Sequence, residues 1–295
     1  MTDRLRIFLA GGTGAVGRRL VPLLVAAGHQ VTGVSRRPGG LDLLCSQGAA
    51  AVPLDVFDAA AVRRAVAEAA PDVVVHQLTA LTEGDRAANA RIRAEGTRIL
   101  VDAARDAGVS RIIAQSLAFA YESGDTPADE HTPLDRAGRP GLADSLLALE
   151  GAVAELPGHV VLRYGEFYGP GTWYAPGGPV EALLRGRPGD GPAAGMVAGL
   201  AANDAVSSFL HVEDAALAAV AALDWPSGPV NIVDDEPAPA REWLPVLADA
   251  LGAPAPEPAA GRAGWQRGAD NALARSRGWR PRHPSWRGGF ATQAG

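Results

Sequence analysis

Three glycines near the start of the chain have the spacing of a phosphate-binding turn. Gly11, Gly14 and Gly17 follow the pattern G-x-x-G-x-x-G, between an apolar run and a segment with helical periodicity. The first glycine permits a tight turn, the second lets the backbone approach a pyrophosphate, and the third lets the next helix pack on the sheet. Because a strand precedes the turn and a helix follows it, the pattern predicts a dinucleotide site rather than an ordinary turn. The residues that we expect to line this part of the site are Gly11, Thr13, Gly14, Ala15, Val16 and Gly17.

Two arginines follow the second apolar run, where a dinucleotide fold places the adenosine ribose. An acidic residue at this position accepts a hydrogen bond from the 2′-hydroxyl of NAD, whereas arginines bind the 2′-phosphate of NADP. Ser35, Arg36 and Arg37 therefore favour NADP(H) as the cofactor. The alternative is a pair of solvated loop arginines, which is common at a strand end.

Two further strand ends supply candidate cofactor contacts. Asp55 follows the third apolar run and can accept a hydrogen bond from the adenine amino group, with Val56 against the ring. A helix N-cap is an equally good interpretation of Asp55. The fourth run ends at Leu78, Thr79 and Ala80, where we expect the nicotinamide ribose.

The elements that must hold these residues alternate regularly along the first half of the chain. Buried parallel strands are predicted at residues 5–10, 30–34, 50–54, 73–76, 111–114 and 159–162. Helices are predicted at residues 16–27, 41–47, 59–69, 85–107 and 142–155, with C-caps at Gly28, Gly48, Gly108 and Gly158. This alternation predicts an α/β fold with a Rossmann-type doubly wound parallel sheet. We expect an NADP-binding domain over residues 1–170 and mainly a smaller substrate-binding cap and lid over residues 171–295, from which about residues 208–236 return to the sheet.

The composition limits the class of protein. The chain has 295 residues, of which 47% are hydrophobic, and a net charge of −6, which suits a substantial core and disfavours nucleic acid or an anionic membrane as a partner. We find no apolar run of membrane-spanning length and no signal peptide, and Cys45 is the single cysteine, so a cytoplasmic protein without disulfides is predicted. The six histidines show no metal-binding spacing, and we expect no metal.

One count has a chemical consequence. All 27 residues counted as Lys+Arg are arginines, so no mechanism here can use a lysine. Together with 36 glycines and 23 prolines, this is typical of the GC-rich codon usage found in actinomycetes.

The order and spacing of several motifs resemble those of a known family. Over nearly its whole length the chain is similar to short-chain dehydrogenases/reductases of the extended or atypical kind, the relatives of nucleotide-sugar epimerases and dehydratases. The motifs that carry the resemblance are residues 11–17, Asp55-Val56, residues 73–80, Asn89 with Gly96-Thr97, and residues 162–171, 209–215 and 231–235. The resemblance implies an NAD(P)-dependent oxidoreductase in which the backbone at Phe167 meets the nicotinamide carboxamide. It also implies a structural role for His211.

The chain departs from this family in its catalytic residues. Relatives end the fifth strand with a serine or threonine that polarises the substrate carbonyl. Alignment on Tyr121 places Leu117 at that position, one residue after Ser116. Ser116 is the remaining candidate for a catalytic residue, as a proton relay or as a hydrogen-bond donor to the substrate oxygen. The alternative is an internal hydrogen bond at the strand end.

The proton donor of the family is missing as well. Relatives carry Tyr-x-x-x-Lys, with a glutamate four residues later. Because Glu150 matches that glutamate, Leu146 stands in the place of the lysine and Leu142 in the place of the tyrosine. The tyrosine that donates the proton and the lysine that lowers its pKa are therefore both absent.

The substrate side of the predicted site lies in the second half of the chain. From residue 172 to residue 208 the regular alternation stops, and apolar and aromatic side chains stand among glycines and prolines. A helix over residues 193–206 and a mobile lid are predicted there, and the alternative is a cap with its own small core. This content suits a flat apolar substrate better than a sugar nucleotide. The residues that we expect to contact the substrate are Leu117, Tyr121, Glu166, Trp173 and Met196.

These inferences predict an NADPH-dependent ketoreductase that acts on a bulky apolar metabolite without the usual Tyr/Lys acid. An aromatic polyketide of the angucyclinone type, from antibiotic biosynthesis, fits the cap and the codon usage. Two alternatives remain open: a catalytically silent NADP-binding protein that senses redox state or regulates a partner, and a redox-neutral cyclase or epimerase on the same fold. The sequence does not indicate an oligomeric state.

Overall fold

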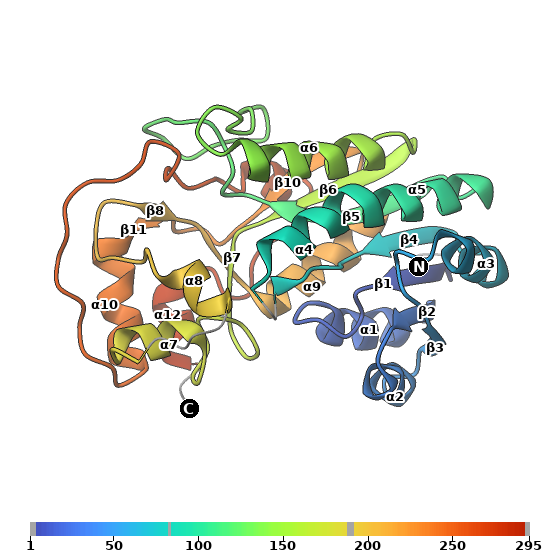
Figure 1. Ribbon diagram of the computed structural model, residues 1–295, viewed down its shortest axis with the longest axis horizontal. Helices are drawn as coiled ribbons and strands as arrows, with labels where there is room; N and C mark the ends of the chain where they lie inside the picture. Colours follow the sequence, from blue (N-terminus) through green and yellow to red (C-terminus); the bar gives the residue numbers. More distant parts are fainter. Residues whose placement is uncertain (1–3, 82–83, 188–191, 293–295) are drawn as a thin grey trace.

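Seven parallel strands form the central sheet of the computed structural model, which describes residues 4–81, 84–187 and 192–292 (Figure 1). Their order is β10-β6-β5-β4-β1-β2-β3, so the chain reverses its progress across the sheet between β1 and β4. Doubly wound folds bind ligands in the crevice outside the carboxyl ends of two such strands. The strands are β1 (Arg6–Ala10), β2 (Gln30–Ser35), β3 (Ala50–Pro53), β4 (Val73–His76), β5 (Arg111–Leu117), β6 (Gly158–Tyr164) and β10 (Gly228–Ile232).

Helices cover both faces of this sheet, which explains why its strands are apolar on both sides. Along β1, Ile7 and Leu9 pack into one core, while Phe8 and Ala10 pack into the other. Successive side chains of a strand point to opposite faces, so a sheet covered on both faces needs nearly continuous apolar strands. One layer contains α1 (Gly17–Ala26), α2 (Pro38–Ser46) and α9 (Val212–Ala221), and the other contains α3 (Ala59–Ala69), α5 (Thr97–Asp106) and α6 (Pro140–Val153).

The single helix predicted over residues 85–107 is interrupted. α4 (Arg86–Arg91) passes into a π-helical turn, η2 (Ile92–Gly96), and then into α5. π-helical turns are rare and are frequently found at functional sites. This one carries Arg93, whose guanidinium reaches Ser145 on α6 (Nη1 to Oγ, 3.3 Å).

The elements of the cap gather around a third core beyond one end of the sheet (Figure 1). The ring of Phe209 lies within this core, with centroid distances of 5.0 Å to Trp243 and 5.2 Å to Phe290. Two short strand pairs, β7–β9 and β8–β11, accompany it. The elements outside the sheet and its helix layers are β7 (Glu166–Tyr168), α7 (Pro179–Leu184), α8 (Pro192–Val197), β8 (Val206–Ser207), β9 (Phe209–His211), β11 (Ala238–Pro239), α10 (Ala240–Ala250) and α12 (Trp286–Thr292). The short elements η3 (Ala222–Asp224) and α11 (Ala272–Ser276) pack into the same core as α9.

Two local predictions are wrong. Gly158 does not cap a helix but begins β6, where an added Cβ would lie 3.0 Å from the Ser110 carbonyl oxygen. Close packing beside β5 therefore explains this glycine. The helix predicted over residues 193–206 ends at Val197, because the chain turns at residues 198 and 199. In contrast, the glycines at positions 28, 48 and 108 adopt the positive φ expected of helix C-caps.

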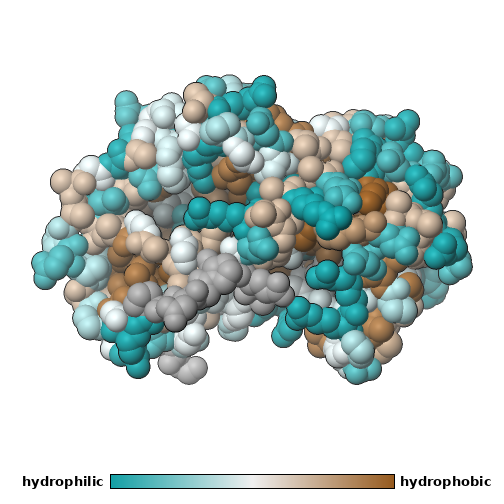
Figure 2. Space-filling model, in the orientation of Figure 1, coloured by the Kyte–Doolittle hydropathy of each residue, from teal (hydrophilic) through white to brown (hydrophobic). Residues whose placement is uncertain are grey.

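The face of the molecule in Figure 2 mixes hydrophilic and hydrophobic residues, without a continuous hydrophobic band. Among the large hydrophobic side chains of the described residues, Leu147 is the exposed one, at 40%. None of the described helices is long and apolar enough to cross a membrane.

Candidate functional site

The glycine-rich turn joins β1 to α1 at the point where the strand order reverses. Gly11 has a φ of +98°, and a Cβ added there would lie 2.4 Å from the Gln77 carbonyl carbon. A Cβ at Gly17 would lie 2.2 Å from the Gly11 carbonyl oxygen. At Gly14, by contrast, the nearest atom to an added Cβ is that same oxygen at 3.5 Å. Two of the glycines are therefore required by the fold, whereas a side chain at Gly14 would make only an ordinary contact within the protein. The close approach of a pyrophosphate to Gly14 stays a prediction.

The tip of β2 lies beside this turn. The Ser35 hydroxyl oxygen accepts a hydrogen bond from the Arg37 N–H (3.1 Å), and α2 begins at the next residue. A Cβ at Gly40, in the first turn of α2, would lie 2.2 Å from Ser35 Oγ and 3.1 Å from Thr13 Cγ2. Gly40, which the sequence analysis missed, thus lets α2 approach the glycine-rich turn. Arg36 and Arg37 are exposed at this tip, an arrangement that fits a 2′-phosphate.

Asp55 does not cap a helix. Its Oδ1 accepts the Phe57 N–H (3.0 Å), whereas Asp58 is the N-cap of α3 and accepts the Ala61 N–H (2.9 Å). The N-cap interpretation of Asp55 is wrong because the helix begins further along the chain. Asp55 is exposed and Val56 is half-buried, and their contact with adenine stays a prediction.

The segment after β4 is held by buried polar side chains. The Ala80 N–H donates to Asn89 Oδ1 (3.1 Å), and the Leu78 N–H donates to His76 Nδ1 (3.3 Å). The other ring nitrogen of His76 lies 2.9 Å from Thr97 Oγ1. Burial lowers the pKa of His76 to about 4, so the ring is neutral near pH 7 and can fill both roles. These contacts fix the loop that is predicted to meet the nicotinamide ribose.

Ser116 lies in a row of polar side chains that crosses three strands. Its register partner on β6 is Arg163, whose partner on β10 is Asn231. The Ser116 hydroxyl donates to Glu150 Oε1 (2.7 Å), and Arg163 donates two N–H groups to the same carboxylate (3.0 and 2.7 Å). Although burial opposes its charge, the hydrogen bonds and the charge of Glu150 raise the pKa of Arg163. Ser116 therefore forms the internal hydrogen bond that is the alternative to a catalytic role, and that role stays a prediction.

Tyr121 is buried and hydrogen-bonded within the protein, and its contact with the substrate stays a prediction. It is 1% exposed, and its hydroxyl donates to Asn231 Oδ1 and accepts from Arg163 Nη1 (3.2 Å). Burial raises the pKa of this hydroxyl to about 12. The sequence analysis did not find these partners, because they come from β6 and β10, far along the chain from residue 121.

The other three tyrosine hydroxyls of the chain also face the interior. Burial raises the pKa of each, so none is poised to lose a proton near pH 7. Tyr164 donates to the Ala215 carbonyl oxygen (3.3 Å), and Tyr174 donates to Glu166. Tyr168 packs in the third core. That no tyrosine donates the proton to a substrate stays a prediction.

A narrow cavity lies between the ends of β4 and β5. Its lining residues are Leu78, Thr79, Arg93, Gln115, Ser116, Leu117 and Leu149. The cavity lies between the loop that is predicted to meet the nicotinamide ribose and two residues of β5, Ser116 and Leu117. The resemblance places Leu117 at the carbonyl-polarising position of the family, one residue after Ser116. Arg93 is a candidate functional residue that the sequence analysis missed. The sequence pattern predicts an uninterrupted helix over this segment, and a single arginine in a helix does not by itself indicate a functional site.

β7 carries two of the predicted contacts. Glu166 accepts hydrogen bonds from the Tyr174 hydroxyl and from Ser207 Oγ (3.1 Å), and burial raises the pKa of its carboxyl group. The ring of Phe167 lies 5.3 Å from that of Tyr164. Their contacts with substrate and cofactor stay predictions.

Trp173 and Met196 belong to the cap. Trp173 is half-buried against the third core. Met196, on α8, accepts a hydrogen bond from Arg86 Nε at its sulfur (2.7 Å). Because Arg86 begins α4, this contact links α8 to a helix beside the sheet. The lid and its contact with the substrate stay predictions.

Three potential metal ligands meet although their sequence spacing did not indicate it. The ligand atoms of His211, Glu213 and His283 lie within 4.8 Å of one another. However, His211 Nδ1 accepts the Glu213 N–H (3.4 Å) as the N-cap of α9. The His211 ring also lies against the His283 ring, with 3.7 Å between centroids and an interplanar angle of 37°. These contacts explain His211 as a structural residue, and we assign no metal to the group.

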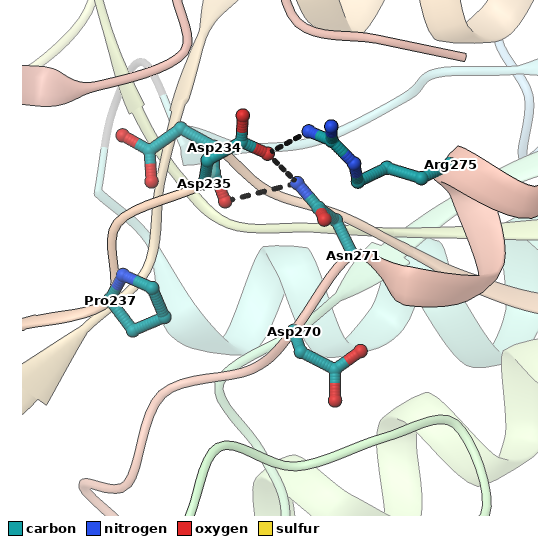
Figure 3. Close-up of a pocket in the computed structure, with 6 residues that line it drawn as sticks. All are labelled: Asp234, Asp235, Pro237, Asp270, Asn271 and Arg275. Carbon is teal, nitrogen blue, oxygen red and sulfur yellow. Dashed lines mark hydrogen bonds and ion pairs between the residues drawn. The ribbon is translucent and has the colours of Figure 1, made fainter. Parts of the chain in front are cut away.

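A wider hollow lies at the edge of the sheet, after β10 (Figure 3). Asp235 accepts a hydrogen bond from Asn271 Nδ2 (2.8 Å) and pairs with Arg275 Nη1 (2.6 Å). The lining residues are Asp234, Asp235, Pro237, Asp270, Asn271 and Arg275. Three strands separate β10 from β1, and the wall is acidic, so this hollow is not the site of an anionic dinucleotide.

The glycine-rich turn, its place at the reversal of a parallel sheet and the cap beyond it define a Rossmann-type, NAD(P)-dependent oxidoreductase. The model of the NAD dependent epimerase/dehydratase family matches residues 7–233, and the chain belongs to this family. The resemblance inferred from the motifs is thereby confirmed.

Two curated relatives come from Streptomyces. The chain is 44% identical to a 3-diazoavenalumate denitrifying reductase from Streptomyces sp, over 98% of this chain and 100% of that protein. It is 32% identical to the 2′-dehydrokanamycin reductase of Streptomyces kanamyceticus, over 85% of this chain and 68% of that protein. Both relatives are named as reductases, which confirms the prediction of an oxidoreductase.

Solved structures confirm the predicted fold. The UDP-glucose 4-epimerase of Thermus thermophilus, in complex with NAD, is 25% identical with a TM-score of 0.76, over 98% of this chain and 97% of that one. The UDP-glucose 4-epimerase of Thermotoga maritima with UDP-glucose is 20% identical with a TM-score of 0.74, over the same shares of both chains. The first neighbour holds NAD, so these comparisons support dependence on NAD(P) without choosing between the two cofactors.

Proposed function

We propose that this protein transfers a hydride from NADPH to a diazo-bearing, flat and largely apolar metabolite, and that the diazo group leaves as N₂. For the diazonium form of the substrate the balance is R–N₂⁺ + NADPH → R–H + N₂ + NADP⁺. The bonding pair of the C–N bond leaves with N₂, and the hydride pair forms the new C–H bond. The protein binds and orients the two reactants and excludes water.

The observation that carries this proposal is the lack of a placed proton donor. Reduction of a ketone needs a proton for the alkoxide, and a positioned acid contributes about a hundred- to ten-thousand-fold to such a step. The diazo reaction above consumes no proton. The chain has no lysine, leucines stand at positions 142 and 146, and its four tyrosine hydroxyls face the interior. A site built in this way loses little in a reaction that needs no acid.

The relatives support the same chemistry. The relative that matches this chain over 98% of its length is named as a denitrifying reductase of a diazo compound. A full-length match to a reductase favours hydride transfer over a redox-neutral cyclase or epimerase, and over a silent cofactor-binding protein. Its Streptomyces source supports a role in specialised metabolism such as antibiotic biosynthesis.

NADP(H) is the proposed cofactor because of the tip of β2. Arg36 and Arg37 are exposed beside the glycine-rich turn, where α2 approaches through Gly40. Two charge-assisted hydrogen bonds to a 2′-phosphate, of about 1.5–3 kcal/mol each, favour NADPH over NADH by more than about tenfold.

Isotopes test the reaction directly. The protein is incubated with NADPH that carries deuterium at both C4 positions and with an aryl diazonium substrate that carries ¹⁵N at both nitrogens. We expect doubly labelled N₂ by mass spectrometry, and one deuterium on the carbon that held the diazo group. Reactions without protein measure spontaneous nitrogen loss. Nitrogen release without deuterium on that carbon contradicts the proposal.

Carbonyl reduction of an aromatic polyketide, such as an angucyclinone, is the second candidate. Ser116 lines the cavity one residue before the family's carbonyl-polarising position, and the relative at 32% identity is named as the reductase of a dehydro compound. The proton then comes from water or from a phenol of the substrate next to the carbonyl. Loss of NADPH absorbance with a panel of polyketide ketones, but not with diazo compounds, supports this candidate instead.

A further inference from the structure

Arg93 is a buried cation whose charge is not compensated by an acidic side chain of the described chain. It is 9% exposed, and Nη1 donates to Ser145 Oγ (3.3 Å). Within residues 4–81, 84–187 and 192–292 it forms no ion pair. Burial lowers its pKa to about 10, so the guanidinium remains charged near pH 7.

Arg163 is a second buried arginine of this fold, and unlike Arg93 it is paired with an acidic side chain. It is 6% exposed, and Glu150 holds it with two hydrogen bonds. A charge buried without such a partner is costly, and perturbed groups of this kind cluster at functional sites. Since a guanidinium has five N–H donors and Arg93 uses one of them on Ser145, the others are available to a ligand.

The surroundings of Arg93 suit an anionic group of a ligand. The guanidinium lines the narrow cavity with Thr79 and Ser116, and Leu117 and Leu149 supply apolar walls. Glu150, on the same helix as Ser145, is engaged by Arg163 and Ser116 and leaves Arg93 uncompensated. The cavity therefore offers a positive charge next to the loop that is predicted to hold the nicotinamide ribose.

We propose that Arg93 forms an oxyanion site for the reacting metabolite, in which its guanidinium binds a phenolate or enolate oxygen conjugated to the carbon that receives the hydride. This inference rests on the proposed function and narrows its substrate class. A diazo compound with such an oxygen is an inner salt, ⁻O–R–N₂⁺, without net charge. The balance ⁻O–R–N₂⁺ + NADPH → ⁻O–R–H + N₂ + NADP⁺ leaves a full negative charge on that oxygen.

The arginine thus does electrostatically what the missing acid does with a proton. A fixed cation in a site that excludes water stabilises charge as it develops, and its effect is larger there than in water. The guanidinium keeps its own protons, so the product leaves as the anion and takes a proton from solvent. Substrates without an oxygen in conjugation with the reacting carbon are expected to react poorly.

4-Nitrophenol tests the site without turnover, because its anion absorbs visible light and its neutral form does not. The protein with bound NADP⁺ is titrated with this probe at several pH values. The variants are R93Q and R93K, with R91Q as a matched control. Arg91 is exposed at the end of α4, two residues before Arg93, and pairs with Glu95. The affinity for NADP⁺ is measured in a separate titration, in which the bound cofactor quenches the fluorescence of the protein.

We expect R93Q to bind the nitrophenolate anion about tenfold or more weakly, with R93K in between and R91Q like the wild type. NADP⁺ affinity should stay within about twofold in all three variants. Unchanged anion affinity in R93Q overturns the proposal, and so does an equal loss of NADP⁺ affinity, which assigns Arg93 to the cofactor instead. If R93Q does not fold by circular dichroism, R93K decides, since undiminished anion affinity in R93K overturns the proposal.

The two proposals can fail separately. A wild-type protein that reduces no diazo compound but binds nitrophenolate through Arg93 refutes the reaction and keeps the oxyanion site. Reduction of diazo compounds at the same kcat in R93Q and in the wild type keeps the reaction and refutes the site.

Discussion

Gly14 and Gly17 are two residues of one motif for which the structure predicts opposite defects. A Cβ at Gly17 would lie 2.2 Å from the Gly11 carbonyl oxygen and 2.6 Å from backbone atoms of Gly12. Backbone atoms cannot rotate away, so Gly17→Ala overpacks the start of α1 at a cost of about 2–3 kcal/mol. Better helix propensity returns up to about 1 kcal/mol, which leaves a net loss of about 1–2 kcal/mol.

For Gly14→Ala the magnitudes are reversed. The added Cβ meets only the Gly11 carbonyl oxygen, at an ordinary contact distance of 3.5 Å, so stability should change by no more than about 0.5 kcal/mol. The methyl group would occupy the space where we expect the pyrophosphate. Loss of one backbone hydrogen bond to a charged phosphate, about 1.5–3 kcal/mol, weakens NADPH binding by about 10- to 150-fold.

Chemical denaturation gives the free energy of unfolding of each variant, and calorimetry gives the NADPH affinity. Gly151→Ala is the control, because Gly151 lies in α6 and nothing lies within 4 Å of an added Cβ. It should stabilise the protein by about 0.5–1 kcal/mol and leave NADPH binding unchanged. Equal losses of stability for Gly14→Ala and Gly17→Ala, or full NADPH affinity in Gly14→Ala, would refute the reasoning.

Four further predictions follow from the site. Arg36→Ala/Arg37→Ala should lose about tenfold or more in NADPH affinity without weakening NADH binding, and equal binding of both cofactors by the wild type contradicts this. Met196→Ala, which removes the contact of α8 with α4, should raise the KM for substrate, whereas a parallel loss of NADPH affinity makes α8 part of the cofactor site. Tyr174→Phe should retain turnover within about tenfold, since its hydroxyl serves Glu166, and loss of turnover with both ligands bound would identify a relocated acid. The pKa of His76 falls from 6.5 to about 4 on folding, so the neutral ring stabilises the folded protein above pH 6.5. As the pH falls from 6.5 toward 4, the free energy of unfolding should decrease by about 1.4 kcal/mol per pH unit. Chemical denaturation at pH 7 and at pH 5 measures this decrease, and His76→Gln, which cannot titrate, is the control.

The nucleotide-binding half of the fold could be predicted because its signals are local. β4 and α3 have the bounds that their apolar periodicity predicts, and Gly11 has the positive φ that its place in the turn requires. Periodicity also predicted the two-sided burial of the strands. Such features depend on residues within a few positions of one another, so one sequence is enough to find them.

The parts that could not be predicted depend on residues far apart in the chain. Tyr121 follows a strand and carries no local sign of burial, but its hydroxyl is held by Asn231 and Arg163 from two other strands. The periodicity around Arg93 predicts a regular helix and gives no sign of a π turn. The hydrogen bond of Arg93 to Ser145 on α6 joins residues that are far apart in the sequence. The pairing of β6 with β10 brings the partners of Tyr121 together, and the packing of η2 on α6 brings Arg93 to Ser145.

Leu142 and Leu146, which the resemblance places where the family has its tyrosine and lysine, are part of a packed cluster. Leu146 is fully buried in a cluster with Leu117 and Tyr121, and Leu142 packs against the same cluster. A lysine at position 146 would bury an ammonium group there at a cost of several kcal/mol, and Glu150, an acid one turn away, is already held by Arg163. The packing of α6 against the end of β5 therefore favours apolar residues at these two positions. The narrow cavity has apolar leucine side chains on its wall and the guanidinium of Arg93, which no acidic side chain of the described residues compensates. This combination favours a reaction in which the protein stabilises a negative charge on the substrate rather than donating a proton to it.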